Sequence, residues 1–79
     1  MMSASQRLVY MANQIARNFE AQGEAAAAQA TADHIALYWD PRMRAHILEV
    51  LAAGGEGLSP LAAQAVTLLR ERQGAARAG

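Results

Sequence analysis

The hydrophobic positions of the first twenty residues recur with the period of an amphipathic helix. Large apolar residues lie at intervals of three or four positions, and two alanines fill the same stripe: Leu8, Met11, Ile15, Phe19, Ala12 and Ala16. Ser3 followed by Gln6 is typical of a capping box, and Gly23 ends the pattern. The pattern therefore predicts a helix over about residues 5–22.

Residues 24–38 consist mostly of strong helix formers, which predicts a second helix. Its packing face would carry Ala28, Ala32, Ile35 and either Tyr38 or Trp39. The helix has to stop at this point, because the residue before Pro41 is pushed out of the helical region.

A third helix is predicted over residues 41–53. Asp40 is suited to the N-cap and Pro41 to the first helical position, and Gly54 follows the last turn. The apolar face is formed by Met43, Ile47, Val50 and Leu51.

Ser59 and Pro60 repeat the same start signal and predict a fourth helix over residues 60–72. Its apolar stripe contains Leu61, Ala65, Leu68 and Leu69, and Gly74 is expected to close it. The tail, residues 74–79, has nothing to bury and is predicted to be disordered.

No segment alternates with a period of two, so we expect an all-α fold without a sheet. The chain, residues 1–79, is predicted to form a single domain, a small compact four-helix unit. The helices over 24–38 and 41–53 are joined without a spacer, and this predicts a sharp corner at Trp39 and Asp40.

Composition indicates a thin core. The chain has only 79 residues, 20 of them alanine, and it contains no cysteine that could form a disulfide or a thiolate metal site. A partner protein is the remaining way to reinforce so small a domain.

Charge argues against two classes of partner. Seven arginines, no lysine and seven acidic residues give a formal net charge of zero, and no polybasic block is present, so nucleic-acid binding is not expected. No apolar run approaches the ~18 residues of a membrane span, and no secretory leader pattern is visible. We therefore expect a cytoplasmic protein without membrane contact.

Residues that could perform chemistry have simpler explanations. His34 and His46 lie twelve positions apart without metal-ligand spacing, and Ser3, Ser5 and Ser59 are interpreted as helix caps. The glycines around Glu56 lack the lysine and the preceding strand of a phosphate-binding loop. We predict no catalytic, cofactor-binding or metal-binding residue, and hence no enzyme.

Arg42 and Arg44 are the exception to local helix rules. They lie in the first turn of the predicted third helix, where the helix dipole disfavours cations by roughly 0.3–1 kcal/mol each. Two explanations stay open: they pair with a local carboxylate such as Asp40, or they are offered to a partner.

Trp39, Asn13 and Gln14 also allow two interpretations each. Trp39 is either a core anchor or, as a residue type enriched at binding hot spots, part of an interface. The uncharged amides of Asn13 and Gln14 are either solvated or hydrogen-bonded to the backbone of a partner.

The combined pattern resembles a known family. It comprises Met11-Ala12-Asn13-Gln14-Ile15-Ala16, then His34, Trp39-Asp40-Pro41-Arg42-Met43-Arg44, Gly54-Gly55 and Leu58-Ser59-Pro60. This series is similar to the delta subunit of cytoplasmic, NAD-dependent molybdenum formate dehydrogenases, over about residues 6 to 72.

The resemblance implies a non-catalytic accessory subunit. In that family the alpha subunit holds a molybdenum or tungsten pterin and iron–sulfur clusters, and the beta and gamma subunits pass electrons to NAD through FMN and further clusters. No cofactor is expected in the present chain. Its predicted partners are the alpha, beta and gamma subunits, and the isolated chain could form a homodimer.

The predicted partner-binding residues are Asn13, Gln14, His34, Trp39, Arg42 and Arg44. Two other classes of function stay open. The third helix, its glycine turn and the fourth helix have a faint likeness to a helix-turn-helix, so the alternative is a small helical DNA-binding or regulatory protein. A small enzyme or ligand carrier is the third hypothesis.

Overall fold

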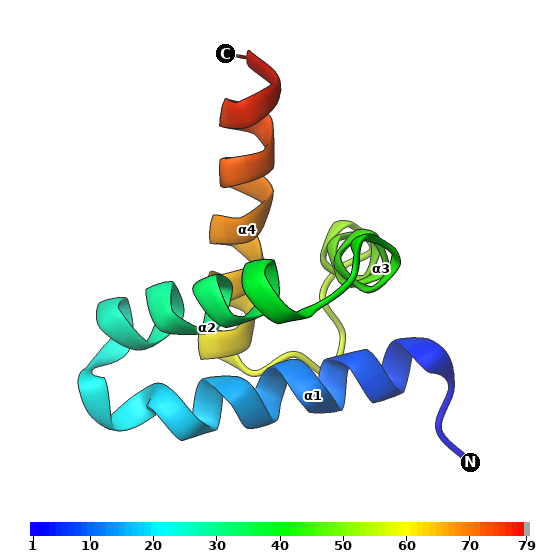
Figure 1. Cartoon of the computed structure of the whole chain (residues 1–79). Coiled ribbons are helices and arrows are strands. Elements are labelled where there is room, and N and C mark those ends of the chain that lie inside the picture. The colour runs from blue at the N-terminus through cyan, green and yellow to red at the C-terminus, as the bar shows by residue number, and fades with distance from the viewer. Residues whose placement is uncertain (79) are drawn as a thin grey trace.

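Five helical elements form the fold (Figure 1). A computed structural model describes residues 1–78, with the side chains of residues 1–75. The elements are α1 (Ala4–Phe19), the 3-10 turn η1 (Glu20–Gln22), α2 (Glu24–Tyr38), α3 (Pro41–Ala52) and α4 (Pro60–Ala78). The described part of the chain contains no strand, so the predicted all-α, four-helix fold is confirmed.

Local capping signals start three of the helices where the sequence predicted. The Ser3 hydroxyl accepts from the Gln6 backbone N–H at 3.1 Å, and the Gln6 side chain accepts from the Ser3 N–H at 2.9 Å, which completes the capping box. Asp40 accepts from the Met43 N–H at 2.9 Å to start α3. The Ser59 hydroxyl accepts from the Ala62 N–H at 3.1 Å to start α4.

The sharp corner between α2 and α3 is confirmed. Trp39 adopts an extended conformation (φ −84°, ψ 141°), and so does Asp40 (φ −73°, ψ 166°), so the helical path is broken at two consecutive residues. The chain turns there from the axis of α2 onto that of α3, which Figure 1 shows end-on. The corner thereby brings the C-terminus of α2 beside the first turn of α3.

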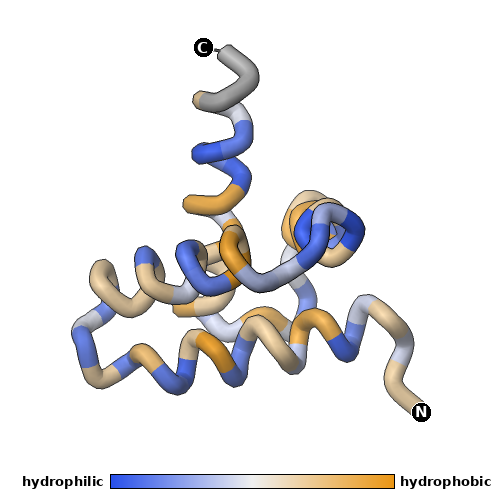
Figure 2. Tube along the Cα trace, in the orientation of Figure 1, coloured by the Kyte–Doolittle hydropathy of each residue, from blue (hydrophilic) through white to orange (hydrophobic). Residues whose placement is uncertain are grey.

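Helix α2 lies at the centre of the packing. It runs antiparallel to α1, and α4 crosses it on another side (Figure 1). Its packing face is made mostly of small side chains. In Figure 2 the first half of α2 is mostly pale orange, which marks weakly hydrophobic positions, with blue hydrophilic positions between them. The buried positions of α2 are Ala27, Ala28, Thr31, Ala32 and Ile35. Of the two candidates at the end of this face, Trp39 is buried and Tyr38 is exposed.

The hydrophobic core joins residues of all four helices and the corner. It contains Leu8, Ala12, Ala16, Ile35, Trp39, Ile47, Ala62, Val66 and Leu69. Half-buried side chains such as Met11, Ile15 and Met43 pack against it. Because so many core positions are alanines, the helix axes can approach closely, but the buried apolar area remains small.

Two predicted helix ends are wrong. The first helix ends as an α-helix at Phe19, and the last three of its predicted residues form the 3-10 turn η1 instead. The fourth helix does not close at Gly74. It continues to Ala78, because Gly74 has no positive φ and the alanine after it favours the helix.

The C-terminal part of α4 projects beyond the other helices (Figure 1). Of the predicted disordered tail, residues 74–79, the first five residues, 74–78, belong to α4, and residue 79 lies outside the described residues. Of the helices that the structure describes, none combines the length and the apolar character needed to cross a bilayer.

Candidate partner-binding surface

Arg44 contacts the end of α2 rather than a carboxylate. Its guanidinium Nη1 donates to the backbone oxygen of Trp39 and, at 3.4 Å, to that of Ala36. The carbonyls in the last turn of a helix have no partner within the helix and lie at its negative end. The positive charge that is unfavourable at the start of α3 is thus favourable for the end of α2, and Arg44 holds the corner closed.

Arg42 has different surroundings. It is exposed, and within residues 1–75 no ion pair or side-chain hydrogen bond involves it. Asp40, the expected local carboxylate, instead caps the Met43 N–H. Of the two arginines in the first turn of α3, Arg42 is the one whose guanidinium is free to meet another molecule.

Asn13 connects α1 to the loop between α3 and α4. Its Nδ2 donates to the Gly57 carbonyl oxygen at 2.9 Å, and its Oδ1 accepts from the Ser59 N–H at 2.9 Å. The Asn13 amide is therefore not merely solvated. It bonds backbone groups, as predicted for a contact with a partner, but these groups belong to its own chain. Gly57 is required in this loop, because its φ is +88° and a Cβ there would lie 3.2 Å from Val9 Cγ1.

Gln14 and His34 lie on the surface beside tyrosines. The exposed Gln14 donates to the Tyr10 hydroxyl at 2.8 Å. The half-buried His34 ring lies 4.8 Å from that of Tyr38 in a tilted arrangement. Both tyrosines are large exposed side chains, so each of these polar residues lies next to an aromatic surface.

Trp39 belongs to the core, with only 4% of its surface exposed. Its ring packs inward, as the first of the two interpretations proposed, while its backbone oxygen accepts from Arg44. The six predicted residues are therefore not one contiguous surface. Trp39, Arg44 and Asn13 hold the fold together, and Gln14, His34 and Arg42 remain available from solvent.

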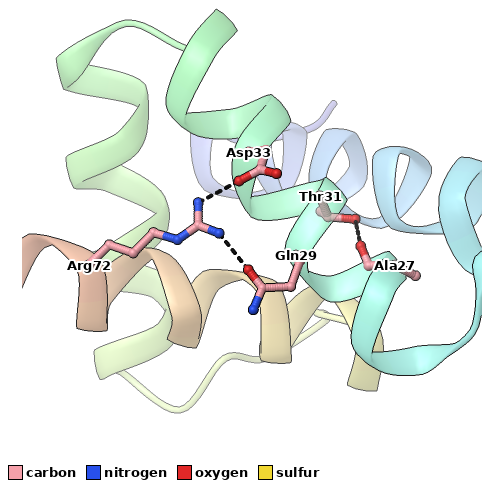
Figure 3. Close-up of polar contacts among 5 residues, drawn as sticks. All are labelled: Ala27, Gln29, Thr31, Asp33 and Arg72. Carbon is pink, nitrogen blue, oxygen red and sulfur yellow. Dashed lines mark hydrogen bonds and ion pairs between the residues drawn. The ribbon is translucent and has the colours of Figure 1, made fainter.

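Three polar contacts were not anticipated from the sequence. Ser5 does not cap a helix, because its hydroxyl lies 2.8 Å from His46 Nε2 and connects α1 to α3. Arg72 of α4 reaches α2, where it contacts Asp33 at 2.8 Å and Gln29 at 2.7 Å (Figure 3). The spacing of Gln29 and Asp33, one helical turn apart, is the signal that could have indicated a shared partner.

Figure 3 also shows the Thr31 hydroxyl donating to the Ala27 carbonyl oxygen at 2.8 Å. The bond satisfies a hydroxyl that is fully buried between helices.

Among the described residues, no three His, Asp or Glu side chains are grouped closely enough to hold a metal ion.

Comparison with protein families identifies the chain. The family model of the NADH-dependent formate dehydrogenase delta subunit, FdsD, matches residues 7–66. This chain belongs to that family. Searches of curated proteins and of solved structures give no match.

The region matched to the delta-subunit family contains the features that shape the fold. It includes the corner with Arg44 and the bonds from Asn13 to the α3–α4 loop. Arg72 and the projecting end of α4 lie beyond it. The family match therefore covers the core from Leu8 to Val66 and leaves out only Leu69 of the buried cluster.

Proposed function

We propose that this delta-family chain is a non-catalytic accessory subunit that associates with the catalytic subunits of an NAD-dependent formate dehydrogenase in the cytoplasm. The observation that carries the proposal is the family match over residues 7–66. The thin, alanine-rich core supports it, since a partner surface would add the apolar burial that this domain provides only in small measure.

The proposed partners are the alpha, beta and gamma subunits. The molybdenum pterin, the iron–sulfur clusters, FMN and NAD would be held by these subunits, so this chain needs no cofactor of its own. Its contribution would be to assembly, to stability or to insertion of the molybdenum cofactor.

Co-purification tests the association. The chain carrying an affinity tag is produced together with the alpha, beta and gamma subunits of its host, and the retained proteins are identified by mass spectrometry. The expected result is stoichiometric recovery of the alpha subunit at moderate salt. Absence of every formate dehydrogenase subunit from the eluate would contradict the proposal.

A second measurement separates the three roles. The catalytic subunits are produced with and without this chain, and both the amount of assembled complex and its molybdenum content per alpha subunit are determined. A lower molybdenum content with unchanged assembly indicates cofactor insertion. Less complex with an unchanged molybdenum content indicates assembly or stability, and no change in either quantity would exclude all three roles.

A further inference from the structure

A groove between α1 and α3 combines an apolar floor with arginines at its edge. Leu8 and Met11 of α1 and Met43 of α3 supply apolar side chains, of which both methionines are only half-buried. Arg7 and Arg42 line the same groove from opposite helices, and both are exposed. The site thus offers contact for an apolar side chain between two positive charges.

The charges of this groove are not compensated within the described part of the chain. No Asp or Glu lines it, and the ion pair found among residues 1–75 joins Arg72 to Asp33 elsewhere. The first turn of α1 also contributes the positive end of a helix dipole, whereas at α3 the Asp40 carboxylate already caps the Met43 N–H. The electrostatic potential therefore favours an anionic occupant.

The walls of the groove are fixed before any partner arrives. The 2.8 Å contact between Ser5 and His46 joins α1 to α3, and His46 is part of the lining. Arg44 fixes the first turn of α3 to the end of α2. Arg42 lies in the same turn, so the backbone that carries it is held in place. A preformed site lowers the entropy cost of binding.

We propose that this groove binds an acidic segment of a partner subunit, with a large apolar side chain in the groove and carboxylates beside Arg7 and Arg42. The inference rests on the proposed function, because the segment is assigned to a subunit of the formate dehydrogenase. Charge complementarity selects this occupant over a basic or neutral segment.

Charge reversal tests the groove without a cost to folding. In the variant Arg7→Glu/Arg42→Glu, both acids lie in first turns, where the helix dipole favours them. The control, Arg17→Glu/Arg70→Glu, alters two exposed arginines outside the groove and changes the net charge equally. Because Arg17 lies in the last turn of α1, where the dipole disfavours an acid, the control is the less stable variant, and weaker binding by the groove variant alone cannot come from lost stability. Circular dichroism checks that both variants retain the helix content of the wild type.

Binding of both variants and of the wild type to the co-produced catalytic subunits is then compared at low and moderate salt. We expect the groove variant to bind about tenfold more weakly or worse, with the control close to the wild type. If the wild type binds and the groove variant binds equally well, the groove proposal is overturned while the proposed function stands. If the wild type itself does not bind, the proposed function fails.

Cross-linking tests the chemistry of the occupant. Because the chain has no cysteine, an Ala4→Cys variant places a single thiol at the groove for a photoactivatable maleimide reagent. Mass spectrometry of the co-purified complex should then identify a peptide in which acidic residues flank a large apolar one. A cross-linked peptide without acidic residues, or one from a second copy of this chain, would overturn the proposal.

Discussion

At the scale of single residues, position in the helix does not decide what an arginine does. Arg42 and Arg44 occupy the same first turn and face the same unfavourable dipole. Arg44 has the end of a second helix beside it and donates to the Trp39 and Ala36 oxygens, whereas Arg42 extends into solvent. The sequence left two explanations open, a local carboxylate or a partner protein, and Arg44 follows neither, because it donates to backbone oxygens at the end of the preceding helix.

Replacing each arginine by methionine separates the two cases, because methionine keeps the stem of the side chain and removes the charge. Arg44→Met should lower the free energy of unfolding by about 1–2 kcal/mol, since two carbonyls of α2 lose a charged donor. Arg42→Met should leave it within about 0.5 kcal/mol. Urea denaturation followed by circular dichroism measures both, and equal effects would contradict the capping role of Arg44.

Asn13 and its neighbour Gln14 form a second matched pair. Asn13→Ala should cost about 1–2 kcal/mol of unfolding free energy, because the Gly57 oxygen and the Ser59 N–H lose their side-chain partner. Gln14→Ala removes only an exposed bond to Tyr10 and should cost less than about 0.5 kcal/mol. If the two variants denature at the same urea concentration, Asn13 does not hold the loop.

At the scale of elements, the signals that are local in sequence predicted well. The side chains of Ser3, Asp40 and Ser59 each accept from the backbone N–H three residues further along, and these short-range bonds fix three helix starts. The contacts of Asn13 and of Ser5 join residues more than 40 positions apart, and no local pattern encodes them. The predicted end of α4 is wrong because Gly74 adopts helical angles, at a modest cost, instead of ending the helix.

The helical state of Gly74 leads to a stability prediction. Gly74→Ala should raise the free energy of unfolding by about 0.4–1 kcal/mol, since alanine favours the helix and its Cβ meets no atom within 4 Å. Gly23→Ala is the contrasting control, because a φ of +95° strains alanine and should lower the stability. Thermal unfolding monitored at 222 nm measures both; an unchanged Gly74→Ala variant would mean that the helix already ends before this residue.

At the scale of the whole molecule, stability depends on a few large buried side chains. The Ala-rich contacts around α2 bring the helices together closely, yet the large fully buried residues among the described positions are few: Ile35, Ile47, Val66 and Thr31. Domains of this size have total stabilities of only several kcal/mol. Association with a larger protein would raise this value by mass action.

Truncation of Ile35 should therefore affect the entire fold. Ile35→Ala removes a side chain that is 0% exposed and should cost about 2–5 kcal/mol, a large part of the total, whereas Ile35→Val should cost about 0.5–1.5 kcal/mol. Circular dichroism of the isolated variants should show partial or complete loss of helix for alanine only. Retained cooperative unfolding near the wild-type midpoint would show that the core is less dependent on Ile35 than its burial indicates.

The bonds of Asn13 also constrain the order in which the chain can fold. Their acceptor and donor belong to Gly57 and Ser59, 44 and 46 residues further along the sequence. During synthesis, α1 and α2 can pair early, but the α3–α4 loop can bond to Asn13 of α1 only after Ser59 has been made. The groove between α1 and α3 also depends on a long-range contact, because Ser5 of α1 bonds to His46 of α3, 41 residues further along the chain. A partner segment that binds in the proposed groove can do so only after α1 and α3 have packed together, so its binding would report that this long-range contact has formed.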